Sequence, residues 1–114
     1  MRNLLKETKE VLKENKKTLK DVLWCGSEEY GWFDIDVFEK LADKEYDGGY
    51  GAQEVAKDLV LVGKDFWLER DEYDGSEWWD YKTTPKKPKK NTIPTTLIKG
   101  MWESLTEMNT PTTY

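Results

Sequence analysis

Histidine is absent from this sequence and cysteine occurs only once, and both shortages exclude whole classes of site. Without an imidazole, the chain has no histidine general base and no Ser-His or Cys-His nucleophile pair. One cysteine without histidine cannot form a structural zinc site, and Cys25 has no partner for an internal disulfide. We therefore expect a protein that works by binding, not an enzyme, and one without a cofactor.

Long apolar runs are also missing. No stretch approaches the roughly 20 apolar residues that a membrane-spanning helix requires. The N-terminal residues alternate apolar and charged side chains, which is not the pattern of a signal peptide. Because no disulfide points to an oxidising compartment, the expected location is the cytoplasm, and no contact with a membrane is expected.

Charged and aromatic residues are abundant instead. Charged residues make up 36% of the chain, against a usual share of about 25%. A chain of 114 residues has the size of one domain, and six tryptophans, six tyrosines and three phenylalanines must supply much of its core. We therefore expect a single domain over residues 1–114 with a densely charged surface.

The net charge of -5 conceals three blocks of different sign. Residues 1–26 carry seven basic and four acidic side chains, residues 27–80 carry 17 acidic and five basic ones, and residues 81–114 carry six lysines and two glutamates. The acidic centre repels phosphate backbones, so direct binding to duplex nucleic acid is not expected. The same acidic centre attracts basic surfaces, including the grooves of proteins that bind nucleic acid. Alternatively, it is only a solvated face that keeps the protein soluble.

The first half of the chain predicts helices and strands in alternation. Helical spacing of apolar residues indicates the helices, and short apolar runs ended by glycine indicate the strands. The expected elements are a helix over residues 3–17, a strand over Asp21–Gly26, a helix from a cap at Asp34 or Asp36 to about Tyr46, a helical turn near Gln53–Lys57 and a strand over Leu59–Val62.

The clearest element is a β-hairpin over residues 66–83. Its two runs, Phe66–Tyr73 and Ser76–Thr83, are joined by Asp74-Gly75, a two-residue turn in which both residues need a positive φ. This turn pairs Tyr73 with Ser76 and therefore Arg70 with Trp79. One face of the hairpin then belongs to the core, with Arg70 over Trp79, and carries Phe66, Leu68, Trp79 and Tyr81.

A Pro/Lys linker follows the hairpin at residues 84–92. Apolar side chains at helical spacing then predict an amphipathic C-terminal helix over residues 95–108. The expected fold class is therefore α+β: a small antiparallel β-sheet built around the hairpin, with an N-terminal helix, a middle helix and a C-terminal helix.

The second face of the hairpin is the candidate protein-binding site. Its aromatic rings can anchor a partner and its carboxylates can steer a basic one. Glu69 lies opposite Asp80, and adjacent like charges cost stability unless a partner or a cation answers them. Alternatively, a helix covers the tryptophans and leaves only the acids outside. The candidate residues are Trp67, Glu69, Asp71, Tyr73, Trp78 and Asp80.

Residues 43–54 resemble the loop of an EF-hand calcium site. Acidic residues or glycine occupy loop positions 1, 3, 5, 6 and 12 after a helix. The loop departs from that pattern at positions 3 and 8, and a helix C-cap before a glycine-rich turn accounts for the same residues. We therefore expect no metal, and the calcium alternative rests on Asp43, Glu45, Asp47 and Glu54.

The glycines of the same loop allow a ligand to approach the backbone closely, and two tyrosines beside them can stack on a base or ring. The segment is not a phosphate loop, because it follows a helix and lacks the Lys-Ser/Thr pair. A small nucleotide is thus the alternative partner, bound by Tyr46, Gly49, Tyr50 and Gly51.

Three stretches, Asp21–Ser27, Asp47–Val55 and Phe66–Trp79, resemble small acidic proteins of Gram-positive phages and prophages. The similarity extends over residues 18–108. Those proteins have no assigned activity, so the resemblance transfers no site residues. It implies a setting, since small phage proteins of this kind are often inhibitors of host defence or regulation, among them anti-CRISPR proteins and sponges for signalling nucleotides.

The sequence thus predicts a phage-type inhibitory binding protein in the cytoplasm of a bacterial host. Its acidic and aromatic surface is expected to block a basic, nucleic-acid-binding groove of a host defence or regulatory protein, as an anti-CRISPR protein would. A small-ligand binder, such as a sponge for a defence nucleotide, is the first alternative. A calcium-binding or purely structural module is the second.

Overall fold

The computed structural model describes residues 1–48 and 51–110. The chain divides into two units, residues 1–84 and residues 85–114. The division falls where the predicted Pro/Lys linker begins. Each unit is described by itself below.

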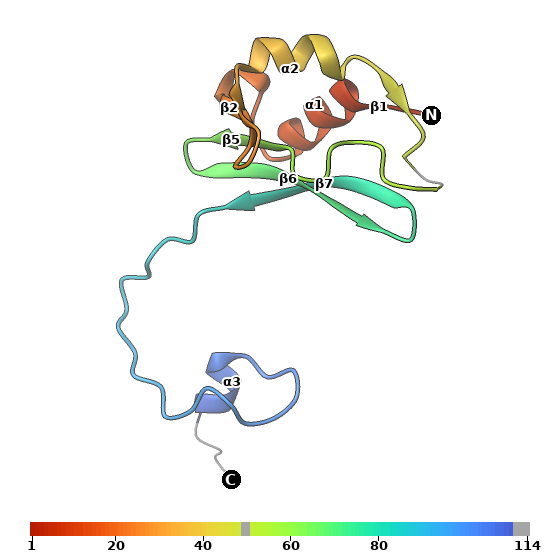
Figure 1. The fold of residues 1–114 in the computed structure, drawn as a ribbon. Coiled ribbons are helices and arrows are strands. Elements are labelled where there is room, and N and C mark those ends of the chain that lie inside the picture. The colour runs from red at the N-terminus through yellow and green to blue at the C-terminus, as the bar shows by residue number, and fades with distance from the viewer. Residues whose placement is uncertain (49–50, 111–114) are drawn as a thin grey trace. The chain divides into compact units, whose positions relative to one another are not determined.

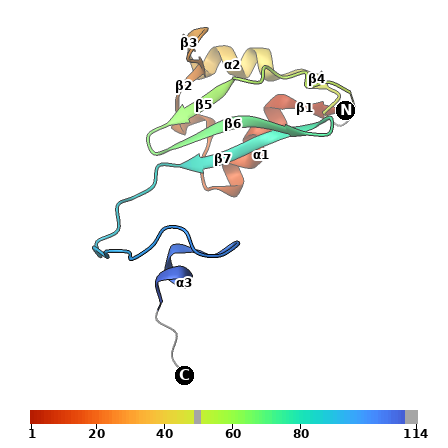
Figure 2. The ribbon, with the colours of Figure 1, turned by 60° about the horizontal axis from the view of Figure 1, so that its bottom comes forward.

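The first unit is built on a five-stranded antiparallel sheet with the strand order β3-β2-β5-β6-β7. Helices α1 (Leu4–Glu14) and α2 (Ile35–Ala42) both lie on one face of this sheet (Figures 1 and 2). The predicted class, mixed helix and strand with an antiparallel sheet, is confirmed. The strands are β2 (Val22–Ser27), β3 (Gly31–Phe33), β5 (Val60–Gly63), β6 (Phe66–Tyr73) and β7 (Ser76–Thr83).

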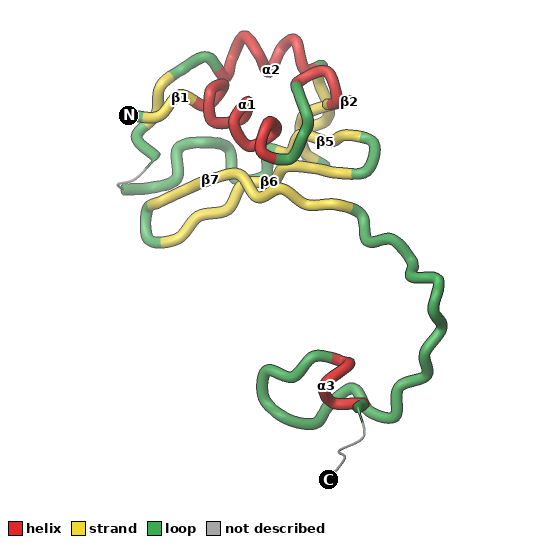
Figure 3. The backbone as a smooth tube through the Cα atoms, turned by 180° about the vertical axis from the view of Figure 1, so that it is seen from behind, coloured by secondary structure: helices red, strands yellow, loops and turns green. Residues whose placement is uncertain are grey.

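A second, two-stranded sheet joins the N-terminus to the segment after α2. Strand β1 (Arg2–Asn3) pairs antiparallel with β4 (Glu45–Tyr46), as Figure 3 shows from behind. Asn3 is also the N-cap of α1, and its side chain accepts a hydrogen bond from the Lys6 N–H at 3.0 Å. The prediction that the middle helix runs to Tyr46 was wrong, because the chain leaves α2 at Ala42 to make this pairing.

Other predicted elements also differ from the structure, and β2 and β5 each lie one residue later than predicted. The first helix ends at Glu14 instead of residue 17, and a short 3-10 helix η1 (Leu19–Asp21) precedes β2. The helical turn expected at Gln53–Lys57 is not formed. The backbone N–H groups of Glu54 and Val55 instead donate hydrogen bonds to the Glu77 carboxylate at 2.8 and 3.2 Å. These two N–H groups are thus satisfied by a tertiary contact with β7.

The core lies between the two helices and the inner face of the sheet. Burying one large aliphatic side chain there contributes about 1.5–3 kcal/mol. Cys25 is fully buried, and burial followed by the nearby charge of Asp34 raises the pKa of its thiol to about 12. The thiol is therefore neutral and serves as a small apolar side chain. The buried cluster is Leu12, Val22, Cys25, Phe38, Ala42, Leu61, Phe66, Leu68 and Trp79.

The β6–β7 hairpin has the register that its turn predicts. Tyr73 pairs with Ser76, Arg70 with Trp79, and every pair between them follows in step. Asp74 and Gly75 have φ values of 50° and 86°, so both turn residues lie in the left-handed region. A type I′ turn needs this geometry because its twist matches that of the two strands.

Replacing Gly75 by valine should destabilise the protein by more than about 1 kcal/mol, because a β-branched residue cannot readily adopt a positive φ. Thermal unfolding followed by circular dichroism measures the change. Gly75→Asn is the matched control, since asparagine tolerates the left-handed region, and it should shift the melting temperature much less. A melting temperature that valine leaves unchanged would contradict this turn.

The C-terminal unit holds one short helix, α3 (Leu105–Asn109), so the predicted helix over residues 95–108 was wrong for most of its length. Ser104 starts α3 with a capping box to Glu107. Before it, Trp102 has a φ of 61°, which a continuous helix does not permit. The Asn109 side chain also accepts hydrogen bonds from the backbone N–H groups of Thr95 and Thr96. The apolar spacing of this segment therefore does not correspond to a helical face.

Within residues 1–48 and 51–110, no helix is both long enough and apolar enough to cross a membrane.

Candidate functional site

One face of the five-stranded sheet collects four of the six tryptophans of the chain. Side chains alternate along a strand, so the residues between the core positions all point away from α1 and α2. We call this surface the outer sheet face. It consists of Trp32 on β3, Trp24 on β2, Val60 and Val62 on β5, Trp67, Glu69, Asp71 and Tyr73 on β6, and Trp78, Asp80 and Lys82 on β7.

The strand pairing aligns these side chains in rows across the sheet. One row runs from Trp24 through Val62 and Trp67 to Lys82. Such neighbours on adjacent strands have Cβ atoms about 4.5–5.5 Å apart and pack on one another. A continuous aromatic and apolar band therefore crosses the outer sheet face, with carboxylates beside it.

Two of the tryptophans form hydrogen bonds with carboxylates of the same strand. The indole N–H of Trp67 donates to Glu69 at 3.1 Å, and that of Trp78 donates to Asp80 at 2.9 Å. Both rings are half-buried. Each ring is thus held by its edge next to a negative charge, and the indole and the carboxylate can contact one partner together.

Glu69 and Asp80 are cross-strand partners of like charge, and a lysine of the same hairpin reduces their repulsion. Lys82 forms an ion pair with Glu69. The hydrogen bond from Lys82, and after it the one from Trp67, lowers the pKa of the Glu69 carboxyl. Glu69 therefore stays ionised at neutral pH, and the predicted cost of adjacent like charges is reduced by a cation of the chain itself.

Trp24 and Trp32 belong to this surface, although neither was predicted as a site residue. Trp32 is 70% exposed, and the two rings line a hollow of about 500 Å³ together with Ser27 and Gly31. Gly26 pairs with Trp32, and glycine lets β3 approach β2 closely, since a Cβ there would lie 2.0 Å from the Gly31 carbonyl oxygen. For Trp24, the signal available in the sequence was strand alternation, which places it on the face opposite its neighbour Cys25.

All six residues of the predicted binding face lie on the outer sheet face. Tyr73 is 77% exposed near the hairpin tip, and Asp71 is exposed beside it. The alternative, in which a helix covers Trp67 and Trp78, does not hold for the helices of residues 1–84. Both α1 and α2 pack on the opposite face (Figure 1).

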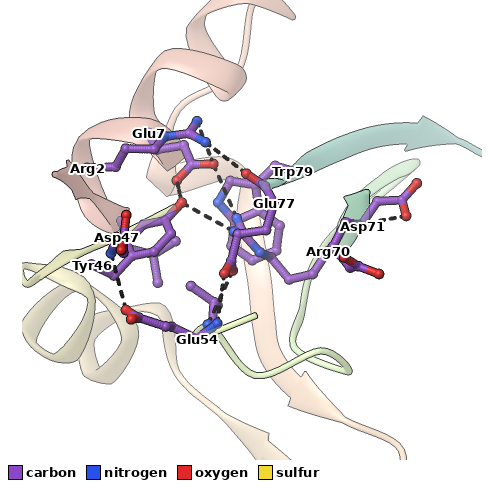
Figure 4. A network of polar contacts seen from close by, with 12 residues as sticks. Arg2, Glu7, Tyr46, Asp47, Glu54, Arg70, Asp71, Glu77 and Trp79 are labelled. Carbon is purple, nitrogen blue, oxygen red and sulfur yellow. Dashed lines mark hydrogen bonds and ion pairs between the residues drawn. The ribbon is translucent and has the colours of Figure 1, made fainter. Parts of the chain in front are cut away.

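A buried ionic network supports the hairpin from its inner face (Figure 4). The Arg70 guanidinium is fully buried and contacts the carboxylates of Glu7 at 3.3 Å and Glu77 at 2.8 Å. It also donates to the Tyr46 hydroxyl at 3.3 Å, and Arg2 forms a second ion pair with Glu7 at 3.1 Å. The network joins α1, β4, β6 and β7, and so holds the outer sheet face on a rigid base.

Arg70 also lies over Trp79, as the sequence predicts, with 4.7 Å between the guanidinium carbon and the ring centroid. The indole N–H of Trp79 donates to the Thr8 hydroxyl at 2.8 Å. The roles of Glu7 and Glu77 were not predicted. Glu77 lies two residues before Trp79 and hence on the core face, a position that could have indicated its burial.

The four residues of the calcium alternative do not converge on one point. Asp43 is the C-cap of α2 and accepts a hydrogen bond from the Asn3 side chain, while Glu45 lies in β4. Glu54 accepts a hydrogen bond from the backbone N–H of Asp47 at 3.2 Å. Across the described residues, no three His, Cys, Asp or Glu side chains are grouped to hold a metal ion.

Tyr46 does not have the exposure that the alternative ligand site requires. It is 7% exposed, and its hydroxyl donates to Glu7. Burial, and after it the hydrogen bond to Glu7, raises the pKa of this hydroxyl. Its ring is therefore part of the network and not free to stack on a base. Gly51 is exposed with a φ of 82°, whereas Gly49 and Tyr50 lie outside the described residues.

No known family matches the chain, and neither sequence nor structure comparison finds a similar characterised protein or a similar solved structure. The resemblance to phage and prophage proteins therefore stays a prediction. The candidate site rests on its geometry alone.

Proposed function

We propose that this chain is an inhibitory binding protein whose outer sheet face covers a basic, nucleic-acid-binding groove of another protein. The observation that carries the proposal is the grouping of four tryptophans with three carboxylates on the sheet face opposite α1 and α2. Neither kind of side chain serves the core there. Their arrangement fits a surface meant to be buried by a partner.

The two kinds of side chain have separate tasks in this proposal. Tryptophan is among the residues that contribute most to binding energy, and burying one well can contribute more than 2 kcal/mol. The carboxylates of Glu69, Asp71 and Asp80 steer a basic partner and exclude acidic ones. A groove that binds phosphates offers lysine and arginine side chains for these carboxylates and stem carbons for the indole rings.

The resemblance to small phage proteins suggests which partner to test first. A host defence or regulatory protein with a nucleic-acid groove, such as a CRISPR effector, meets the chemical requirement. Blocking its groove would inhibit it without any reaction being catalysed.

Capture from a bacterial lysate, with two modes of elution, tests the proposal. We expect the immobilised protein to retain a basic protein that duplex DNA or RNA displaces at constant ionic strength. Trp67→Ala and Trp78→Ala should each weaken retention at least tenfold. Trp102→Ala is the matched control, because Trp102 is 92% exposed in the other unit, and it should retain the partner fully.

Retention that nucleic acid does not displace would contradict groove blocking. Equal retention by Trp67→Ala, Trp78→Ala and the control would show that the outer sheet face is not the binding surface. With a purified partner, charge reversal at Asp71 and Asp80 should slow association and flatten its dependence on salt, since exposed charges act mainly on the rate of encounter.

A further inference from the structure

We propose a second binding site, away from the outer sheet face, for a small apolar ligand that carries a positively charged amine. A cavity of about 690 Å³ opens between α2, the turn after β2 and residues 56–59. Small-ligand sites in proteins have volumes of about 300–1,000 Å³. The site does not depend on the proposed function, because it shares Ser27 with the hollow between Trp24 and Trp32 but is lined by none of the outer tryptophans.

The walls of the cavity are apolar and reach the core. Phe38 and Ala42, each 3% exposed, form its base, and the side chains of Phe33 and Leu59 form part of its sides. At the rim, Tyr30 is 85% exposed and Leu41 is 72% exposed. Large apolar side chains left in water around an opening mark a place where a ligand can be buried.

The charge at the rim decides which ligand fits. The charged side chains that line the cavity are those of Glu29 and Asp58, both acidic, with no lysine or arginine among the lining residues. Both side chains are exposed, so they attract a cation to the rim as surface charges that salt screens. The cavity therefore favours an organic cation and disfavours carboxylates and phosphates, including nucleotides.

An adjoining cavity of about 280 Å³ extends the site along α2. It shares Leu4, Leu41, Ala42, Ala56 and Leu59 with the first, and the charged side chains that line it are two acids and one base, Glu45, Glu54 and Lys44. An alkyl chain can lie along these shared side chains while its ring or ammonium group stays in the larger cavity. The ligand class is thus an aromatic or alkyl ammonium ion.

Three probes of similar size test this site: 4-phenylbutylammonium, 4-phenylbutanol and 4-phenylbutyrate. Amide chemical shifts in the full-length protein locate the binding and titrate it. We expect perturbations at residues 27–30, 41–42 and 56–59, and a dissociation constant for the cation at least threefold below that of the alcohol. The anion should bind most weakly. Raising the salt concentration should narrow these differences, since the carboxylates are exposed.

Matched variants separate the apolar and the ionic contributions. Ala56→Phe should abolish binding of all three probes, because Ala56 is exposed and a larger side chain there fills the opening. Glu29→Gln with Asp58→Asn should remove the preference for the cation and leave binding of the alcohol unchanged. Glu28→Gln is the control, since this neighbouring acid does not line the cavity, and it should change nothing.

Three results would overturn the proposal: no binding of the cation, equal affinity for the three probes, or perturbations centred on the outer sheet face. None of them bears on capture of a basic protein by that face.

Discussion

Replacing Arg70 by methionine should lower the free energy of unfolding by about 3–5 kcal/mol, the usual cost of removing one partner from a buried ion pair. The guanidinium is fully buried between the carboxylates of Glu7 and Glu77, which are themselves 8% and 1% exposed. Methionine matches the length of the arginine stem but leaves both carboxylates without this cation. Proteins of this size are stable by about 5–15 kcal/mol, so the variant should be marginally folded. Urea denaturation followed by circular dichroism measures the loss.

Two further variants show whether the loss comes from the buried charges. Arg70→Met combined with Glu77→Gln should cost less than the two single changes added together, because the residues act as a pair. Lys82→Met removes the exposed ion pair with Glu69 on the same hairpin and should change stability little, since exposed ion pairs contribute little. An Arg70→Met variant as stable as Lys82→Met would show that the network does not support the hairpin.

Replacing Trp79 by alanine should lower the free energy of unfolding by roughly 3–5 kcal/mol, the range for a core aromatic residue. Trp79 is 5% exposed, packs in the core cluster and donates a hydrogen bond to Thr8. The change leaves a cavity next to Arg70 and removes the hydrogen bond that the Thr8 hydroxyl accepts, although that hydroxyl still donates to the Leu4 carbonyl at 2.7 Å. Chemical denaturation again measures the difference.

The adjacent residue is the internal control for that experiment. Trp78 lies on the outer sheet face, is half-buried and has Asp71 as its cross-strand partner. Trp78→Ala should cost only about 1 kcal/mol, the upper range for a cross-strand pair, and should keep the circular dichroism spectrum. If Trp78→Ala unfolds the protein as much as Trp79→Ala does, the outer sheet face belongs to a core and cannot bind a partner.

The hairpin could be predicted residue by residue because its register depends on local chemistry. Asp74 and Gly75 accept positive φ, and this turn sets every later pair by alternation. The split between core and outer residues follows from the same alternation. The candidate surface on β6 and β7 was therefore visible in the sequence, whereas its extension to Trp24 and Trp32 depends on how distant strands pair.

The failed predictions share one cause, which is that helical spacing or propensity alone does not make a helix. Apolar residues from Leu97 to Met108 have helical spacing, but those from Leu97 to Leu105 remain largely exposed and only α3 is helical. Short helices gain most of their stability from packing an apolar face. The apolar side chains from Leu97 to Leu105 are not packed in this way, so a helix there gains little stability. At Gln53–Lys57, the backbone N–H groups of Glu54 and Val55 donate to the Glu77 carboxylate, so a contact with a distant strand sets the backbone there.

The sequence by itself determined the features set by neighbouring residues: the Asp74-Gly75 turn, the register of the hairpin, and a strand face that mixes tryptophan with carboxylates. The tertiary structure decided that α1 and α2 cover the face of Trp79 and leave the other face open, and it added Trp24 and Trp32 to that open face. It also brought Glu7, Arg70 and Glu77 together and left a cavity beside α2. Local chemistry governs turns and alternation, whereas burial depends on contacts between residues far apart in the chain.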